Sequence, residues 1–284
     1  MKEPNSAAAT TTFAIIPGDD ELASIDREIA FFPSPPIQPH SLEPDAIERW
    51  NRDGYLGPID VFTKQAADEL REYFDDLLQR TLAAGGDSYS ISSAHLKHAR
   101  IFDLLTHPAI VGPVVDLLGD DVIGWGSHFF CKLPGDGKSV DWHQDCSYWP
   151  LTPTKSVTVW LAIDDAEADN GCMEVFLGSH RHGLIGFERS DDDSQNVLNK
   201  TIHDPERFGT WNQTPIRAGQ MSIHSDLLVH GSSPNDSDRR RCGLTLRYCP
   251  ADVTAHLGWN AKGVVVSGRA DPDRWPGASR PPNA

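Results

Sequence analysis

The stretch VDWHQDCSYWPLTP, residues 140–153, places His143, Gln144 and Asp145 among aromatic side chains. In a strand or an extended loop, residues i and i+2 point to the same side. His143 and Asp145 can therefore direct an imidazole and a carboxylate toward one point, which is half of a metal site. The same spacing also occurs between unrelated polar residues in loops. A third ligand elsewhere in the chain must decide between the two readings.

Composition limits the classes of protein to which this chain can belong. Its 284 residues suit one large domain or two small ones. The 41 acidic and 25 basic residues give a net charge of −16, which argues against nucleic acid and anionic membranes as partners. No apolar run is long enough to predict a transmembrane helix, and the first residues do not resemble a signal peptide.

The five cysteines are odd in number, widely spaced and without a CxxC pair. This usage is typical of reduced thiols, and we expect a cytoplasmic protein. From general frequencies of assembly we expect a monomer or a weak homodimer.

Helices are predicted in the first part of the chain. Residues 1–44 form an N-terminal extension, rich in alanine, threonine and then proline, that we expect to be partly mobile. Apolar residues recur at helical spacing after Thr63, which predicts a helix that ends near Gly85. A second helix is predicted over 107–121, with Pro108 in its first turn.

From Val122 onward, short β-prone runs alternate with turn residues, as in VIGWGSHFFCKL and SVTVWLAI. A long β region after helices predicts a sandwich or barrel, so the fold is mainly β with flanking helices. Residues 45–252 form the predicted domain. Residues 183–215 are predicted to be a lid-like insertion, and 253–284 an irregular C-terminal tail.

A third ligand is available in the segment MSIHSDLLVHGSS, which contains His224 and His230. His230 ends an apolar run just before Gly231, where a strand would deliver a ligand into a cavity. Two histidines and one carboxylate form the facial triad of non-haem Fe(II) oxygenases. The coordination positions left open suit a bidentate 2-oxo acid and O₂.

A 2-oxo acid with a distal carboxylate requires a fixed cation, and the planar fork of arginine pairs best with a carboxylate. Arg241 lies eleven residues after His230, at the start of the next predicted strand. Ser232 can add a hydroxyl donor. Arg239 and Arg240 are expected to lie in a solvated loop.

Three segments in order resemble the phytanoyl-CoA dioxygenase (PhyH) family: WHQDCSYWPLTP, VTVWLAIDDAEADNGCMEVFLGSHRHG and LVHGSSPNDSDRRRCGLTLRY. The resemblance covers roughly residues 45–250. It implies a double-stranded β-helix (a jelly roll, cupin-like) that uses Fe(II), 2-oxoglutarate and O₂. The implied reaction hydroxylates an unactivated C–H bond of a small organic substrate and releases succinate and CO₂.

The resemblance also assigns roles to residues. Three implied iron ligands, which are also the catalytic residues, are His143, Asp145 and His230. Four residues are implied to contact 2-oxoglutarate: Arg241 and Ser232 at its C5 carboxylate, and Gln144 and Trp160 along its length. Four further side chains are expected to edge a substrate pocket together with the insertion: Trp125, His128, Tyr148 and Trp149.

Several alternatives remain open at this point. Related halogenases have Gly or Ala at the carboxylate position, so Asp145 favours hydroxylation. The same oxidising chemistry can also give desaturation, cyclisation or epimerisation of a natural-product intermediate. A cupin-like metalloenzyme without 2-oxoglutarate would not need Arg241, and a non-catalytic binding module would not need a complete triad. The lack of a conspicuous basic patch argues against an acyl-CoA substrate.

Overall fold

The computed structural model describes residues 17–36, 38–190 and 195–283, and its framework is two antiparallel β-sheets. The larger sheet has the order β1 (Tyr55–Asp60), β10 (Gln220–Ser225), β5 (Val157–Ala162), β12 (Arg241–Pro250), β2 (Val122–Lys132) and β14 (Val264–Ser267). The smaller sheet has the order β3 (Val140–His143), β11 (His230–Ser232), β6 (Glu174–Leu177) and β9 (Thr210–Gln213). The predicted double-stranded β-helix is confirmed.

Short elements connect these strands. Two further strand pairs are β4 (Leu151–Thr152) with β13 (Thr254–Ala255), and β7 (Glu188–Arg189) with β8 (Lys200–Thr201). The 3₁₀ turns are η1 (Ala94–Leu96), η2 (Asp145–Ser147), η3 (Ala168–Asn170), η4 (Ser179–His182), η5 (Pro205–Arg207) and η6 (Trp259–Lys262).

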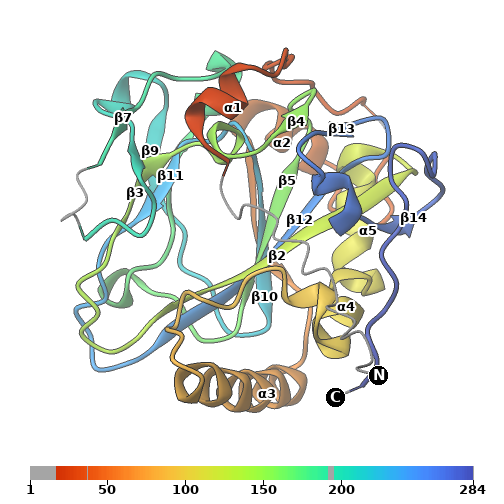
Figure 1. Ribbon diagram of the computed structural model, residues 1–284. Helices are drawn as coiled ribbons and strands as arrows, with labels where there is room; N and C mark the ends of the chain where they lie inside the picture. Colours follow the sequence, from red (N-terminus) through yellow and green to blue (C-terminus); the bar gives the residue numbers. More distant parts are fainter. Residues whose placement is uncertain (1–16, 37, 191–194, 284) are drawn as a thin grey trace, which may run out of the picture.

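Four helices cover the outer face of the larger sheet: α2 (Ala46–Asp53), α3 (Lys64–Ala83), α4 (Ala99–Leu105) and α5 (Pro108–Leu118) (Figure 1). The short helix α1 (Asp19–Ala23) lies apart from them, where Asp19 pairs with Arg189 and Lys200. The two helices predicted from the sequence are confirmed as α3 and α5, and Thr63 Oγ1 accepts a hydrogen bond from the Ala66 amide at 3.3 Å. Phe74 of α3 stacks on Phe129 of β2 with ring centroids 4.7 Å apart.

Strand β12 shows how the sheet separates core from cavity, because successive side chains of a strand point to opposite faces. Four of its residues lie in the core beneath the helices: Cys242, Leu244, Leu246 and Tyr248. Three others line a cavity between the two sheets: Arg241, Thr245 and Arg247.

Two predicted boundaries are wrong. The lid-like insertion of 183–215 includes β9, which pairs with β6 and belongs to the smaller sheet. The tail of 253–284 is not irregular, because β14 pairs with the edge of β2 that would otherwise expose unpaired backbone groups. Trp275 is only 2% exposed and packs over Gly263.

The N-terminal extension is held against the barrel where it is described. The Ala30 amide donates to Thr154 Oγ1 at 3.0 Å, and Arg27 donates to the Trp149 carbonyl at 2.9 Å. The expectation that the extension is partly mobile concerns mainly residues 1–16, which lie outside the described residues. All five cysteines are free and buried.

Within the described ranges, no single helix is long and apolar enough to cross a membrane; α4 and α5 pass that test only as a bent pair.

Candidate metal centre

Three ligands converge where β3 and β11 pair. His143 ends β3 and lies directly opposite His230, the first residue of β11, in the antiparallel register. Asp145 begins the η2 turn that follows β3. One ligand atom from each of these residues lies within 4.8 Å of the other two, and all three side chains are buried. The fold therefore brings the predicted triad together.

Both imidazoles are oriented by backbone carbonyls two residues earlier. His143 Nδ1 lies 2.8 Å from the Asp141 carbonyl, and His230 Nδ1 lies 2.9 Å from the Leu228 carbonyl. A neutral imidazole that donates from Nδ1 leaves the Nε2 lone pair free for a metal. Burial, with the neighbouring His143 and His224, holds the pKa of His230 well below its usual range, so the ring is neutral at neutral pH.

Asp145 is held ionised and oriented at the same point. Burial opposes ionisation, but the nearby imidazoles of His143 and His224, with Nε2 atoms 3.7 Å and 3.6 Å from the carboxylate, hold the pKa of Asp145 well below its usual range. Asp145 Oδ2 accepts a 2.8 Å hydrogen bond from Thr158 Oγ1 of the larger sheet. Two imidazoles and one carboxylate with open positions beyond them match the donor set of a non-haem Fe(II) site.

Residues predicted to contact 2-oxoglutarate line the same cavity. Arg241, Ser232 and Trp160 all face it, and Arg241 is 2% exposed. Arg241 Nε donates to the Gly171 carbonyl at 2.8 Å, and its Nη2 donates to the same oxygen. The Trp160 ring lies over Gly243, where any Cβ would come within 2.0 Å of the ring. This glycine leaves the indole room to lie flat against the sheet.

Gln144 does not line this cavity, contrary to the prediction. Its side-chain amide donates to the carbonyls of Leu227 at 2.6 Å and Gly183 at 2.9 Å, and its oxygen accepts from the Ile185 amide at 2.8 Å. The reason is the alternation of an extended chain: residue i+1 points away from its neighbours i and i+2. Gln144 therefore connects the loop at residues 183–185 to the residues before β11 through hydrogen bonds on the side away from the triad.

The family model for phytanoyl-CoA dioxygenase (PhyH) matches residues 50–243. The chain belongs to the PhyH family. It is an enzyme, an Fe(II)- and 2-oxoglutarate-dependent dioxygenase.

Individual PhyH relatives resemble the chain at modest identity. A probable alpha-ketoglutarate-dependent hypophosphite dioxygenase of Stutzerimonas stutzeri is 28% identical over 189 residues, which are 63% of this chain and 65% of that protein. The L-proline trans-4-hydroxylase of Streptomyces griseoviridis is 27% identical over 231 residues, 72% of this chain and 85% of that protein. The solved structure of the non-heme monooxygenase ThoJ without ligand superposes with a TM-score of 0.72 at 26% identity, over 83% of this chain and 88% of ThoJ.

A larger cavity of about 610 Å³ adjoins the triad of this PhyH enzyme. The two cavities share Phe130, Asp145 and Arg247. Four residues predicted to edge a substrate pocket line the larger cavity: Trp125, His128, Tyr148 and Trp149. The insertion contributes Val197 and Leu198. Burial, with a contribution from Arg247, lowers the pKa of His128 to about 3, so this imidazole is neutral in the cavity.

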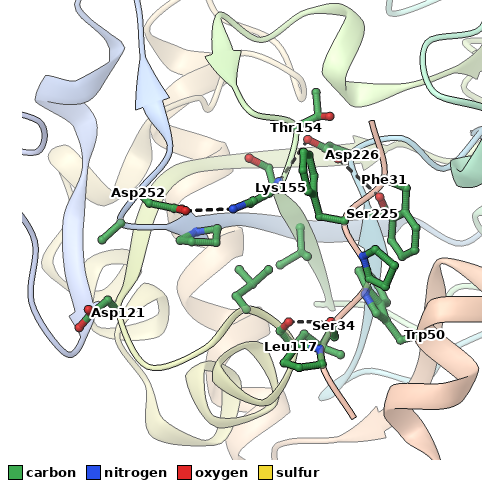
Figure 2. Close-up of a pocket in the computed structure, with 18 of the residues that line it drawn as sticks. Phe31, Ser34, Trp50, Leu117, Asp121, Thr154, Lys155, Ser225, Asp226 and Asp252 are labelled. Carbon is green, nitrogen blue, oxygen red and sulfur yellow. Dashed lines mark hydrogen bonds and ion pairs between the residues drawn. The ribbon is translucent and has the colours of Figure 1, made fainter. Parts of the chain in front are cut away.

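Another pocket, of about 530 Å³, lies among α5, the residues before β5 and the proline-rich segment, away from the triad (Figure 2). None of the three triad residues lines it. Its lysine, Lys155, is paired with Asp252 at 2.9 Å. The one metal-ligand group found among the described residues lines the triad cavity and not this pocket, so the PhyH chemistry belongs to the triad cavity.

Sequence reasoning did not identify Thr158 or Arg247 as part of the PhyH centre. It named His224 only as a possible third ligand, whereas the structure places His224 beside the triad. His224 is 1% exposed, with Nε2 3.6 Å from Asp145 Oδ2 and its ring 4.4 Å from that of His230. The even spacing between Arg241 and Arg247 on one strand was the available signal for Arg247, since it places both on one face.

Proposed function

We propose that the enzyme hydroxylates an unactivated C–H bond of a small organic substrate, coupled to conversion of 2-oxoglutarate to succinate and CO₂. His143, Asp145 and His230 would hold the iron, and Arg241 with Ser232 would hold the C5 carboxylate of 2-oxoglutarate. The observation that carries this proposal is the placement of a complete triad and a buried arginine on one cavity. The bound iron supplies the oxidising chemistry, which the protein itself lacks.

The protein's own contribution is orientation and exclusion of water. Backbone carbonyls fix both imidazoles, and Thr158 fixes one oxygen of Asp145, which leaves the other oxygen for the metal. Arg241 uses Nε and Nη2 on Gly171, so the rest of its fork remains for a carboxylate. The Ser232 hydroxyl faces the same cavity and makes no hydrogen bond within the described part of the chain.

The carboxylate ligand bears on the reaction outcome. Asp145 would supply a carboxylate ligand at the position that a halide would otherwise take, and this supports hydroxylation over halogen transfer. The 610 Å³ cavity supports a small organic substrate, since ligand pockets for such molecules span about 300–1,000 Å³. The relatives named for hypophosphite and L-proline also act on small molecules.

The experiment is an anaerobic titration of the metal-free protein with Fe(II) and then 2-oxoglutarate, followed by visible absorption. We expect a weak charge-transfer band only when both are present, because bidentate binding of 2-oxoglutarate to the iron produces it. His143→Ala and His230→Ala should lose iron binding and the band. Folded, iron-loaded protein without the band would contradict the use of 2-oxoglutarate and favour the cupin-like alternative.

The reaction outcome is read from the product. Succinate formation against a panel of small organic acids identifies a substrate, and mass spectrometry then measures the mass change. Gain of one oxygen atom supports hydroxylation. Loss of two hydrogens, or an unchanged mass with altered configuration, would replace it with desaturation, cyclisation or epimerisation.

A further inference from the structure

Arg247 is a half-buried cation on the wall of both cavities, and the carboxylate that attracts it there is that of the triad residue Asp145. Its Nε is buried without a hydrogen-bond partner, and no ion pair or hydrogen bond involves its side chain among the residues that the structure describes. The Trp149 ring lies 5.2 Å from the guanidinium carbon. Burying a charge without hydrogen-bonded compensation is costly. The guanidinium donors that no described residue engages are available to a ligand in the two cavities.

Neighbouring cations differ from Arg247 in this respect. Arg241, six residues earlier on β12, bonds to the Gly171 carbonyl through two nitrogens. Arg240 pairs with Asp164 at 2.7 Å. In the separate pocket of Figure 2, Lys155 pairs with Asp252. Each of these three cations has a protein acceptor, whereas the guanidinium of Arg247 has none among the described residues.

The fold makes room for this arginine at the junction of the two cavities. Arg247 faces Gly126 in the β12–β2 register, and a Cβ on Gly126 would lie 3.2 Å from Arg247 Cδ. The glycine therefore lets the arginine stem lie across β2. Arg247 lines both the triad cavity and the 610 Å³ cavity, beside Asp145, which also lines both.

The larger cavity offers an excess of donors over acceptors. The Trp125 indole nitrogen and the Tyr148 hydroxyl are buried without partners in the described structure. Lys97 and Lys262 add positive charge to the same wall. Of the two acids on this cavity, Asp145 is a triad residue, and Asp87 already accepts from Ser90 Oγ at 2.6 Å. In a protein of net charge −16, this cavity is locally cationic.

We propose that Arg247 binds an anionic group of the primary substrate, and that the substrates are small organic acids with an apolar or aromatic body. This assignment rests on the proposed function, because it places that anion next to the iron. The arginine fork pairs with a carboxylate or phosphonate through two parallel hydrogen bonds. The walls formed by Trp125, Trp149 and Trp259 bury the apolar part of the molecule.

Calorimetry of the anaerobic Fe(II)–2-oxoglutarate protein tests this assignment with three probes: 3-phenylpropanoate, its neutral amide 3-phenylpropanamide, and phenylphosphonate. We expect the two anions to bind about tenfold or more tightly than the amide. About tenfold in the dissociation constant is the smallest effect expected of a charge-assisted hydrogen bond. In Arg247→Gln the preference should fall to within about twofold, since the amide side chain cannot compensate the anion. The 2-oxoglutarate charge-transfer band should be unchanged in this variant.

Lys97→Gln is the matched control, because it removes the same charge from an exposed residue on the same cavity. Solvent screening should limit its effect to about threefold. Arg247→Gln should unfold at a temperature close to that of the wild type, because the arginine makes no hydrogen bond or ion pair with the described residues that the change would break.

The outcomes are separable. A wild-type protein with the charge-transfer band but no preference for anions, or with no binding of any probe, overturns the role of Arg247. Weakened 2-oxoglutarate binding in Arg247→Gln also overturns it, because the arginine would then serve the co-substrate. A wild-type protein without the band contradicts the proposed function itself, and that result does not depend on Arg247.

Discussion

Three consecutive arginines provide a graded test of the co-substrate assignment. The side chain of Arg239 is 43% exposed, that of Arg240 is 15% exposed, and Arg241 is 2% exposed as a whole residue. Only Arg241 faces the triad cavity. The perturbation we choose is Arg241→Leu, which removes the fork and keeps an apolar side chain in the buried space.

The magnitude follows from the donors that Arg241 has left. An arginine carries five N–H groups, and Gly171 engages Nε and Nη2, so two further hydrogen bonds to a carboxylate are available. Each charge-assisted bond contributes about 1.5 kcal/mol at the low end of its range. We use the low end because Lys132, which interacts electrostatically with Arg241, remains in the variant and still attracts the carboxylate. The sum of about 3 kcal/mol corresponds to about 150-fold in the dissociation constant of 2-oxoglutarate.

The assay is the anaerobic charge-transfer titration with 2-oxoglutarate, preceded by an Fe(II) titration of each variant. Arg241→Leu should bind iron as the wild type does and require about 150-fold more 2-oxoglutarate. Arg239→Gln, which removes a solvent-exposed charge, should match the wild type in both titrations. Equal loss of iron in Arg241→Leu, or an unchanged 2-oxoglutarate requirement, would refute the reasoning.

Three further predictions concern neighbouring groups. Thr158→Val removes the hydrogen bond to Asp145 and should lower iron affinity about 10–100-fold in a direct Fe(II) titration; unchanged affinity would show that Asp145 needs no such support. Gly243→Ala forces a Cβ to within 2.0 Å of Trp160, so we expect a loss of about 1–3 kcal/mol in thermal unfolding and a raised KM for 2-oxoglutarate. An alanine variant with both values unchanged would mean that the indole moves freely. Burial raises the pKa of Asp226 from 3.8 to about 8, so its stabilising contribution is complete below pH 4 and is lost as the pH rises to 8. In metal-free protein, Asp226→Asn should therefore melt higher than the wild type at pH 8 and equally at pH 4; the same difference at both values would exclude this ionisation as the cause.

The ligand triad was predictable because two of its three metal-binding side chains lie two residues apart in the sequence. His143 and Asp145 are two residues apart, and His230 and Arg241 flank one turn between strands. Their mutual position was not predictable, since it depends on β3 and β11 pairing in a register that brings His143 opposite His230. Such pairing is long-range and involves residues about ninety positions apart in the printed sequence.

Other errors have identifiable physical causes. The segment that forms β14 is a short β-branched run, but the glycine, proline and arginine around it dominated the composition of the tail. Gln144 was assigned to the cavity by its place between two ligands, although strand alternation points it away. Arg247 was overlooked although its even spacing from Arg241 puts both on one face of the strand. The lack of a hydrogen-bond acceptor for its Nε among the described residues is visible only in three dimensions.

The hydrogen bond between Thr158 and Asp145 affects how readily the two sheets separate in local unfolding. Two metal ligands belong to the smaller sheet, whose strand β11 has only three residues, and the third is tied to the larger sheet. A bound ion therefore links the two sheets. Because it binds only when all three ligands are together, it stabilises the folded arrangement by mass action. Amide hydrogens of β3 and β11 should exchange with deuterium much more slowly when metal is present, while those of α3 change little. Iron supply would then set how long the molecule resists proteolysis as well as how fast it reacts.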